Sequence, residues 1–251
     1  MAQKDTGWWT NFFDDFRTVF DNIPARYTNA QVKYLIDKLN LKPGRKFLDC
    51  PCGVGRIAIP LARKGIKVTG VDITKSYLDE LASKLKRTGL KMNLVHSDMR
   101  RINYDAEFDA AANIWTSFGY FEKESDNLLV LKKTYKALKP GGKFLMYLIN
   151  RDWLMANYKS STWFPIKNGK VLEENKFDYT KSINYCTWHF IMNGNIKSCR
   201  MNLRLYSLHE LINMFTAVGF INIQSYDSIK EKPVSRESTR IIVIGEKPNK
   251  R

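Results

Sequence analysis

Residues 46–56 read KFLDCPCGVGR and are the most informative part of the chain. A short apolar run meets a glycine-rich turn, and residues 57–64 have the apolar spacing of an amphipathic helix. Glycines allow the backbone to approach a ligand closely, and a new helix directs free N–H groups toward it. The order strand, tight loop, helix therefore indicates a ligand site at this turn.

Two further acidic residues follow at similar intervals. Asp72 and Asp98 each come at the end of a predicted strand, as Asp49 does. The carboxyl ends of parallel strands meet at one edge of a sheet, where α/β proteins bind nucleotides. The spacing therefore predicts that a nucleotide-like ligand lies across this edge.

The rest of the chain alternates between segments with a strand pattern and segments with a helix pattern. Strands are predicted at residues 47–48, 67–71, 92–96, 108–114, 143–149, 220–226 and 240–245. Helices are predicted at 28–39 with Thr28 as N-cap, 57–64, 76–87, 125–138 and 208–218 with Ser207 as N-cap. This alternation predicts an α/β fold with a doubly wound, mostly parallel seven-stranded sheet. The last strand follows its neighbour without a helix and is expected to run antiparallel.

The pattern changes between residues 151 and 206, where β segments are separated by Asn-Gly turns at 167–170 and 192–195. We interpret this segment as an inserted antiparallel sheet of three or four strands, near 171–178, 182–191 and 196–206, that covers the active site. The whole chain is expected to form a single domain. Its first 27 residues contain an aromatic amphipathic helix at 8–20 that either packs on the core or serves as a lid.

The 251 residues carry a formal net charge of +16. The basic residues are spread along the chain, so a solvated lysine surface and an anion-binding face both remain open, and nucleic acid is a possible partner. No apolar stretch is long enough to span a membrane, and the first ten residues lack the pattern of a signal peptide. We therefore expect a cytoplasmic protein with no membrane partner, and leave its oligomeric state open.

Four cysteines, Cys50, Cys52, Cys186 and Cys199, do not have a metal-ligand spacing. In the expected reducing compartment, reduced thiols packed in or near the core are the simplest interpretation. No metal site is predicted.

The glycine loop is consistent with two different cofactors. Residues 53–58, GVGRIA, match the dinucleotide pattern G-x-G-x-x-A, and Asp72 has the spacing of its ribose ligand, which favours NAD and an oxidoreductase. However, Asp49 precedes the glycines, where its charge repels a pyrophosphate and attracts an ammonium group. Ser97-Asp98-Met99 offers an acceptor for an exocyclic amine and an apolar surface for a purine ring.

These motifs resemble those of class I S-adenosylmethionine-dependent methyltransferases, which have a Rossmann-like fold. Residues 49–56, DCPCGVGR, are similar to the first motif of that family, although Pro51 stands where glycine is commoner. Residues 70–72, 97–99 and 113–115 are similar to the second, third and fourth motifs, and 138–142, LKPGG, to the turn before strand five.

The resemblance implies S-adenosyl-L-methionine as cofactor and S-adenosyl-L-homocysteine as product. It assigns the methionine part to Asp49 and the backbone of 52–55, and the ribose to Asp72. The expected cofactor-binding residues are Asp49, Cys52, Gly53, Gly55, Arg56, Asp72, Ile73, Asp98, Met99, Asn113, Ile114 and Trp115.

Methyl transfer from a sulfonium needs alignment and exclusion of water more than a fixed catalytic triad. We expect transfer to N or O of a small molecule. Residues 115–121 lack the Asn/Asp-Pro-Pro-Tyr and Pro-Cys motifs of nucleobase methyltransferases, although other RNA targets and a non-enzymatic cofactor-binding regulator remain alternatives. The candidate catalytic residues are His189 and Tyr120. The candidate substrate residues are Phe118, Tyr185, Trp188, Arg204 and Tyr206.

Overall fold

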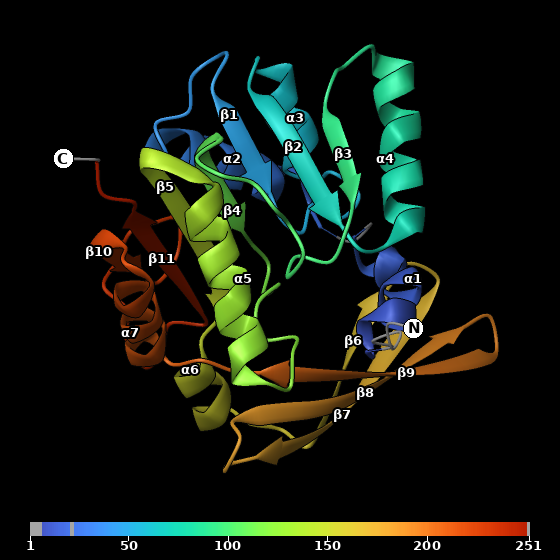
Figure 1. Ribbon diagram of the computed structural model, residues 1–251. Coiled ribbons are helices and arrows are strands. Elements are labelled where there is room, and N and C mark those ends of the chain that lie inside the picture. Colours follow the sequence, from blue (N-terminus) through green and yellow to red (C-terminus); the bar gives the residue numbers. More distant parts are fainter. Residues whose placement is uncertain (1–6, 21–22, 250–251) are drawn as a thin grey trace, which may run out of the picture.

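The computed structural model describes residues 7–20 and 23–249. Two sheets organise this part of the chain (Figure 1): a seven-stranded sheet with the order β10-β11-β5-β4-β1-β2-β3 and a four-stranded sheet with the order β6-β7-β8-β9, called the small sheet below. Helices cover both faces of the large sheet. The predicted fold class is confirmed.

The large sheet has the expected directions. Its strands are β1 (Lys46–Asp49), β2 (Lys67–Asp72), β3 (Asn93–His96), β4 (Phe108–Asn113), β5 (Leu138–Ile149), β10 (Ile221–Tyr226) and β11 (Arg240–Glu246). The five strands β1 to β5 run parallel to one another, whereas β11 pairs antiparallel with both β5 and β10. The amino end of β11 therefore lies at the carboxyl edge of the parallel strands.

Strand β5 starts five residues earlier than predicted. Phe108 of β4 pairs with Leu138, and the next pair joins Ala110 to Lys143, so the turn at 139–142 forms an irregularity within the strand. Gly141 adopts a φ of 72° there, a conformation that glycine tolerates without strain.

The helices of the first half are α1 (Trp9–Phe20), α2 (Ala25–Lys38), α3 (Ala58–Arg63), α4 (Lys75–Thr88) and α5 (Glu124–Ala137). The prediction of Thr28 as an N-cap is wrong, because α2 begins three residues earlier with Pro24 at its N-cap position. Proline lacks an N–H group, and its fixed φ suits a chain that enters a helix. The Thr28 hydroxyl instead accepts a hydrogen bond from Arg56.

The inserted segment contains a short helix that the sequence pattern did not indicate. Residues Arg151–Ala156 form α6, because the side chain of Asn150 caps its amino end by accepting from the N–H of Asp152. The small sheet then follows as β6 (Ser161–Ile166), β7 (Gly169–Asp178), β8 (Ile183–Met192) and β9 (Asn195–Arg204), all antiparallel. The strand β6 was also missed, whereas both Asn-Gly turns lie where they were predicted.

Helix α7 (Leu208–Val218) returns the chain to the large sheet and is capped as predicted. The Ser207 hydroxyl accepts from the N–H of Glu210, and the Glu210 carboxylate accepts from the N–H of Ser207. This reciprocal pair is a capping box, which satisfies two backbone donors at the helix start.

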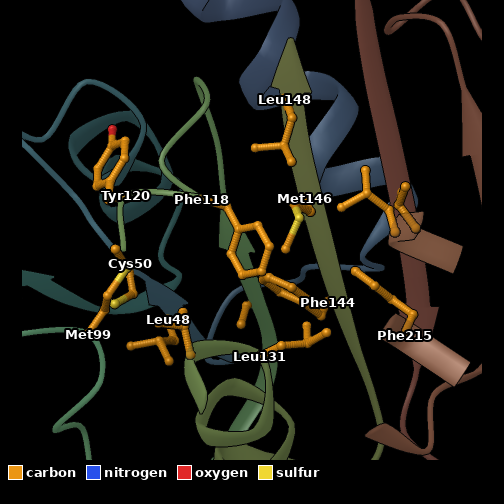
Figure 2. Close-up of a cluster of buried hydrophobic side chains, with 14 of the residues drawn as sticks. Leu48, Cys50, Met99, Phe118, Tyr120, Leu131, Phe144, Met146, Leu148 and Phe215 are labelled. Carbon is orange, nitrogen blue, oxygen red and sulfur yellow. The ribbon is translucent and has the colours of Figure 1, made fainter. Parts of the chain in front are cut away.

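Two hydrophobic clusters lie on opposite faces of the large sheet, as successive side chains of β4 show: Phe108 and Ala111 belong to one cluster and Ala110 and Ala112 to the other. Figure 2 shows the first cluster, in which Phe144 of β5 stacks on Phe215 of α7 with ring centroids 5.6 Å apart. A third cluster joins α1 to the small sheet through Phe12, Trp188 and Phe190. In the described ranges, no helix combines the length and apolarity that crossing a bilayer requires.

Candidate active site

A cavity of about 330 Å³ lies at the carboxyl ends of the parallel strands. The loops after β1, β2, β3 and β4 form its base, and α1 and the small sheet enclose it from the other side. Most of the expected cofactor residues line it, namely Asp49, Cys52, Gly53, Arg56, Asp72, Ile73, Asp98, Met99, Ile114 and Trp115. The volume falls within the range of small-molecule sites.

The glycine loop depends on two left-handed residues. Gly53 has a φ of 53° and Gly55 a φ of 79°. A side chain on Gly55 would also place its Cβ 2.5 Å from Cδ1 of Leu81, so this glycine allows α4 to pack on the loop. Gly55 shapes the turn but does not line the cavity, whereas Gly53 does.

Asp49 ends β1 with its side chain inside the protein, only 2% exposed. Burial raises the pKa of its carboxyl group to about 7, against the opposing effect of the Arg56 charge and with a smaller contribution from Asp72. A carboxylate that is costly to ionise inside the protein gains strongly when a ligand brings a positive charge to it.

Arg56 lies beside Asp49 and is held by α2. Its Nη1 donates to Oε1 of Gln31 at 2.6 Å and to the Thr28 hydroxyl at 3.3 Å. Its guanidinium group lies 5.3 Å from the ring centroid of Trp115. These contacts fix one positive group at the same end of the cavity as the Asp49 carboxyl.

Asp72 joins the end of β2 to the glycine loop. One carboxylate oxygen accepts the N–H of Gly53 at 2.7 Å, and the other accepts the N–H of Thr74 at 2.8 Å. Burial raises its pKa, and these backbone hydrogen bonds act against that shift. Each oxygen keeps a further lone pair, so the carboxylate can accept from two adjacent hydroxyl groups of a ligand.

Asp98 lines the cavity but is already paired. Arg100 binds its carboxylate with a closest distance of 2.6 Å, and the same guanidinium group reaches Asp126 at 3.0 Å and lies 4.1 Å from the ring centroid of Phe121. Asp98 is therefore held in one orientation, with its charge compensated. Met99 follows it and lines the cavity.

The turn after β4 differs from the expectation at Asn113, which is buried and does not line the cavity. Its amide nitrogen donates to the carbonyls of Cys50 and Ser117 at 3.1 and 2.9 Å, which ties this turn to the glycine loop. Its Oδ1 is buried without a hydrogen-bond partner in the described part of the chain.

Trp115 and Thr116 both have left-handed backbones, with φ of 64° and 62°. Non-glycine residues rarely adopt this conformation, and such strain is found preferentially at functional sites. Three contacts hold Thr116: its N–H donates to the carbonyl of Tyr147, and its hydroxyl accepts from the N–H of Ile149 and from Arg240. This arrangement directs the Trp115 side chain to the cavity wall.

Tyr120, a candidate catalytic residue, lines the cavity with its ring against Trp8 and Phe13. Burial raises the pKa of its hydroxyl group well above the ordinary range. The hydroxyl therefore stays protonated at neutral pH and can donate a hydrogen bond, but is a poor base.

Helix α1 closes the cavity with aromatic side chains, among them Phe12, Phe13 and Phe16. Two contacts attach it to elements that follow strands of the large sheet. Just before α1, the Trp8 indole donates to the carbonyl of Tyr120 at 3.2 Å, and within α1 Arg17 pairs with Glu80 of α4 at 2.7 Å. It contacts the small sheet through aromatic rings: the ring centroids of Phe12 and Phe16 lie 5.5 and 5.4 Å from that of Trp188.

Of the residues predicted in the small sheet and its surroundings, the structure brings only Trp188 to the cavity. His189, next along β8, faces away and contacts Ser198 and Glu174 on the outer surface, so it is not placed to act on a ligand in this cavity. Tyr185 also lies on the outer face, by the alternation along β8, and does not line the cavity.

The other three candidates form structural contacts. Phe118 is buried in the core against the ring of Tyr206. Arg204 pairs with Glu210 and Glu124, and the Tyr206 hydroxyl donates to Glu124 at 3.1 Å. Arg204 and Tyr206 thus attach the end of β9 to α5 and α7, and none of the three residues lines the cavity.

Sequence reasoning missed three polar residues that line the cavity, Glu173, Asn184 and Arg240, whereas Thr116 and Ser117 lie in the segment 115–121 that was expected at the site. The predicted antiparallel direction of the last strand is the signal that could have placed Arg240 at the correct edge. No comparable signal existed for Glu173 or Asn184, because strand alternation alone does not say which face of the small sheet is turned inward.

The comparisons with known proteins agree with this geometry. Residues 47–142, which include the glycine loop and all three strand-end carboxylates, match the family described as methyltransferase domain. Residues 47–142 are therefore similar to a methyltransferase domain, which supports the resemblance of the motifs to S-adenosylmethionine-dependent methyltransferases.

Among curated relatives of this chain, the putative methyltransferase YqeM of Bacillus subtilis (strain 168) is 31% identical over 134 residues, which is 53% of either chain. The chain thus spans about half the length of that relative. The ubiquinone biosynthesis O-methyltransferase of Vibrio cholerae serotype O1 is 28% identical over 181 residues, or 70% of this chain and 68% of that protein.

Solved structures show the same fold. An S-adenosylmethionine-dependent methyltransferase from Clostridium acetobutylicum ATCC 824 superposes with a TM-score of 0.79 over 95% of this chain and 100% of that chain, at 20% identity. Because that match extends over nearly all of both chains, the fold likeness includes the inserted segment as well as the family domain.

Proposed function

We propose that this methyltransferase transfers the methyl group of S-adenosylmethionine to N or O of a small molecule. The observation that carries the proposal is the gathering of Asp49, Asp72 and Asp98 with the glycine loop around one enclosed cavity. The match to a methyltransferase domain supports the cofactor class, and the positions of these three side chains provide the reason to place the cofactor here.

The residues fit the three parts of the cofactor. Asp49 and Arg56 lie together at one end and are complementary to the ammonium and carboxylate groups of an amino acid. Asp72 has two oxygens available to ribose hydroxyl groups. Asp98 and Met99 offer an acceptor and an apolar surface to adenine. When bound, the cofactor supplies an activated methyl group on a positively charged sulfur.

The chain's own contribution is alignment and exclusion of water. Aromatic side chains of α1, together with Trp115 and Tyr120, line the cavity on several sides. A neutral Tyr120 hydroxyl can orient a lone pair of the acceptor by donating a hydrogen bond to it. In-line transfer to a sulfonium methyl group depends mainly on this positioning. His189 has no part in the proposal.

The charge of the cavity favours a small acceptor over RNA. Its described lining carries four carboxylates, Asp49, Asp72, Asp98 and Glu173, against two guanidinium groups, Arg56 and Arg240, and no lysine. The net charge of +16 is therefore not concentrated here. A polyanion would meet repulsion at this lining, whereas a neutral or cationic molecule would not. The name of the Vibrio relative specifies an O-methyltransferase, which is consistent with transfer to oxygen.

Calorimetric titration tests the cofactor, and a labelled methyl donor tests the acceptor. We expect S-adenosylhomocysteine to bind and NADH not to bind, and label to enter the small-molecule fraction of a cell extract. Label in the RNA fraction alone would contradict the small-molecule acceptor. Cofactor binding without transfer to either fraction would favour a cofactor-binding regulator.

A further inference from the structure

One carboxylate at the cavity is not explained by the cofactor. Glu173 lies on β7 and lines the cavity from the small sheet, opposite Trp188 in the register with β8. In the neighbouring row of the same sheet, β6, β7 and β8 contribute the apolar residues Phe164, Val171 and Phe190, and the row ends at the exposed Lys197 of β9. Glu173 thus places a charge on an otherwise largely apolar wall.

In the described part of the chain, this carboxylate has no ion-pair partner. In residues 7–20 and 23–249, no Lys, Arg or His lies within salt-bridge distance of Glu173; its one hydrogen bond comes from the Cys186 thiol, with Sγ 3.3 Å from Oε1. Burial raises the pKa of that thiol, and Glu173 adds to the shift, so Cys186 stays protonated and donates. A thiol is a weak donor and leaves most of the carboxylate's hydrogen-bonding capacity unused.

The adjacent residue shows that the lack of a cation is particular to the inner face. Glu174 points to the outer surface and pairs with His189 at 3.1 Å. Among the described basic residues, none is placed against Glu173. The side chain is half-buried, and a ligand that brings a positive charge to it can form a charge-assisted hydrogen bond.

An aromatic ring lies next to Glu173. Trp188 lines the cavity opposite Glu173 in the strand pair, and its side chain is only 9% exposed. Its indole Nε1 is enclosed near the Cys186 thiol, so the ring and not the N–H is available to the cavity. The wall therefore presents an acceptor of hydrogen bonds beside an aromatic face that suits a cation.

We propose that the acceptor is a small amine, protonated in solution, whose ammonium group is held by Glu173. This inference rests on the proposed function and specifies its substrate class. The ammonium group donates to the Glu173 carboxylate and lies against the ring of Trp188. The carboxylates assigned to the cofactor lie on the large sheet, so Glu173 is the residue of the small sheet that distinguishes an amine from an alcohol.

The test compares benzylamine with benzyl alcohol, which has nearly the same size and shape but no charge at neutral pH. Each is titrated into the protein by calorimetry, with and without saturating S-adenosylhomocysteine. We expect benzylamine to bind about tenfold or more tightly than benzyl alcohol, as a charge-assisted hydrogen bond would produce. Glu173→Gln should remove this preference. The matched control Glu174→Gln, one residue along the same strand and facing outward, should keep it.

Equal affinity for the two compounds, or no measurable binding of benzylamine, would overturn the inference. So would a Glu173→Gln variant that keeps the preference. If that variant does not fold, the comparison on the unaltered protein still decides. The affinity for S-adenosylhomocysteine should be the same in both variants and in the parent protein. Its absence in the parent protein would refute the proposed function, which keeps the two failures distinct.

Discussion

The carboxylate of Asp72 accepts the backbone N–H of Gly53 over 2.7 Å, so the end of β2 is fastened to the glycine loop that follows β1. The same side chain fixes the loop and faces the cavity. Asp72 therefore couples the shape of the loop to the proposed contact with the cofactor ribose, and its replacement should affect both.

Asp72→Ala should weaken binding of S-adenosylhomocysteine by roughly 1–3 kcal/mol, because paired polar groups lose their partner. Calorimetric titration measures the change. Asp79→Ala is a suitable control, because Asp79 is an exposed residue of α4 whose ion partner is Lys75. An unchanged dissociation constant for Asp72→Ala would show that the ribose does not bind there.

Asp49 should make cofactor binding dependent on pH. Its pKa is raised to about 7 by burial, so below pH 7 the group is protonated and must lose a proton before it can pair with an ammonium group. Affinity for S-adenosylhomocysteine should fall as the pH decreases below about 7, by up to about tenfold per pH unit, and level off above it. The neighbouring Asp72, whose pKa is also raised, contributes in the same direction. A flat profile between pH 5 and 8 would contradict this assignment.

The same group should set part of the pH dependence of stability without ligand. Because the folded protein holds the Asp49 proton more tightly than the unfolded chain, its contribution to the free energy of unfolding falls as the pH rises from about 4 to about 7 and is constant above. Asp49→Asn should therefore raise the free energy of unfolding at pH 8 by up to about 4 kcal/mol. Denaturant titrations at pH 5 and pH 8 should show a smaller loss between the two values for the variant.

Phe16→Ala should speed the release of S-adenosylhomocysteine. Phe16 lines the cavity from α1 and rests against Trp188, with ring centroids 5.4 Å apart. Loss of this ring opens the wall that α1 provides, so the dissociation rate should rise severalfold in stopped-flow displacement. Phe164→Ala is the control, because Phe164 contacts the same Trp188 ring at 5.3 Å but does not line the cavity. Equal dissociation rates in the two variants would argue against α1 as a cover.

Ser207→Ala should lower the free energy of unfolding by about 1 kcal/mol. The substitution removes the hydroxyl half of the capping box at the start of α7. Burial opposes ionisation of Glu210, but its hydrogen bonds with Ser207 and Arg204 outweigh this and hold its pKa below the usual range. Thermal and denaturant unfolding measure the loss, and a value near zero would show that Arg204 and Arg151 hold Glu210 without the hydroxyl.

The cofactor half of the site could be predicted because its information is local. Asp49 and Asp72 end β1 and β2, Asp98 follows the end of β3 by two residues, and parallel strands bring their carboxyl ends together. The same reasoning could not show that Asp98 is paired with Arg100, because that contact depends on how the loop after β3 turns.

The acceptor half could not be predicted in this way. Trp188 and His189 are neighbours on β8 and were both candidates, but only one of two successive strand residues can face the cavity. Which face is inward is decided by the contact of the small sheet with α1, far away in the sequence. Glu173 lies on the inward face because it pairs with Trp188 in the register of β7 and β8. The loop at 179–182 that sets this register contains no Asn-Gly turn, so the sequence did not indicate it.

No hydrogen-bonded ladder joins the small sheet to the large one, since each has its own complete strand order. Exchange of β6–β9 between proteins of this fold therefore breaks no strand pairing of the cofactor half. Hybrids that combine this glycine loop with a foreign small sheet should inherit their choice of acceptor from the donor of the sheet. The choice of acceptor can therefore change through the small sheet while the strand pairing that shapes the cofactor half is kept.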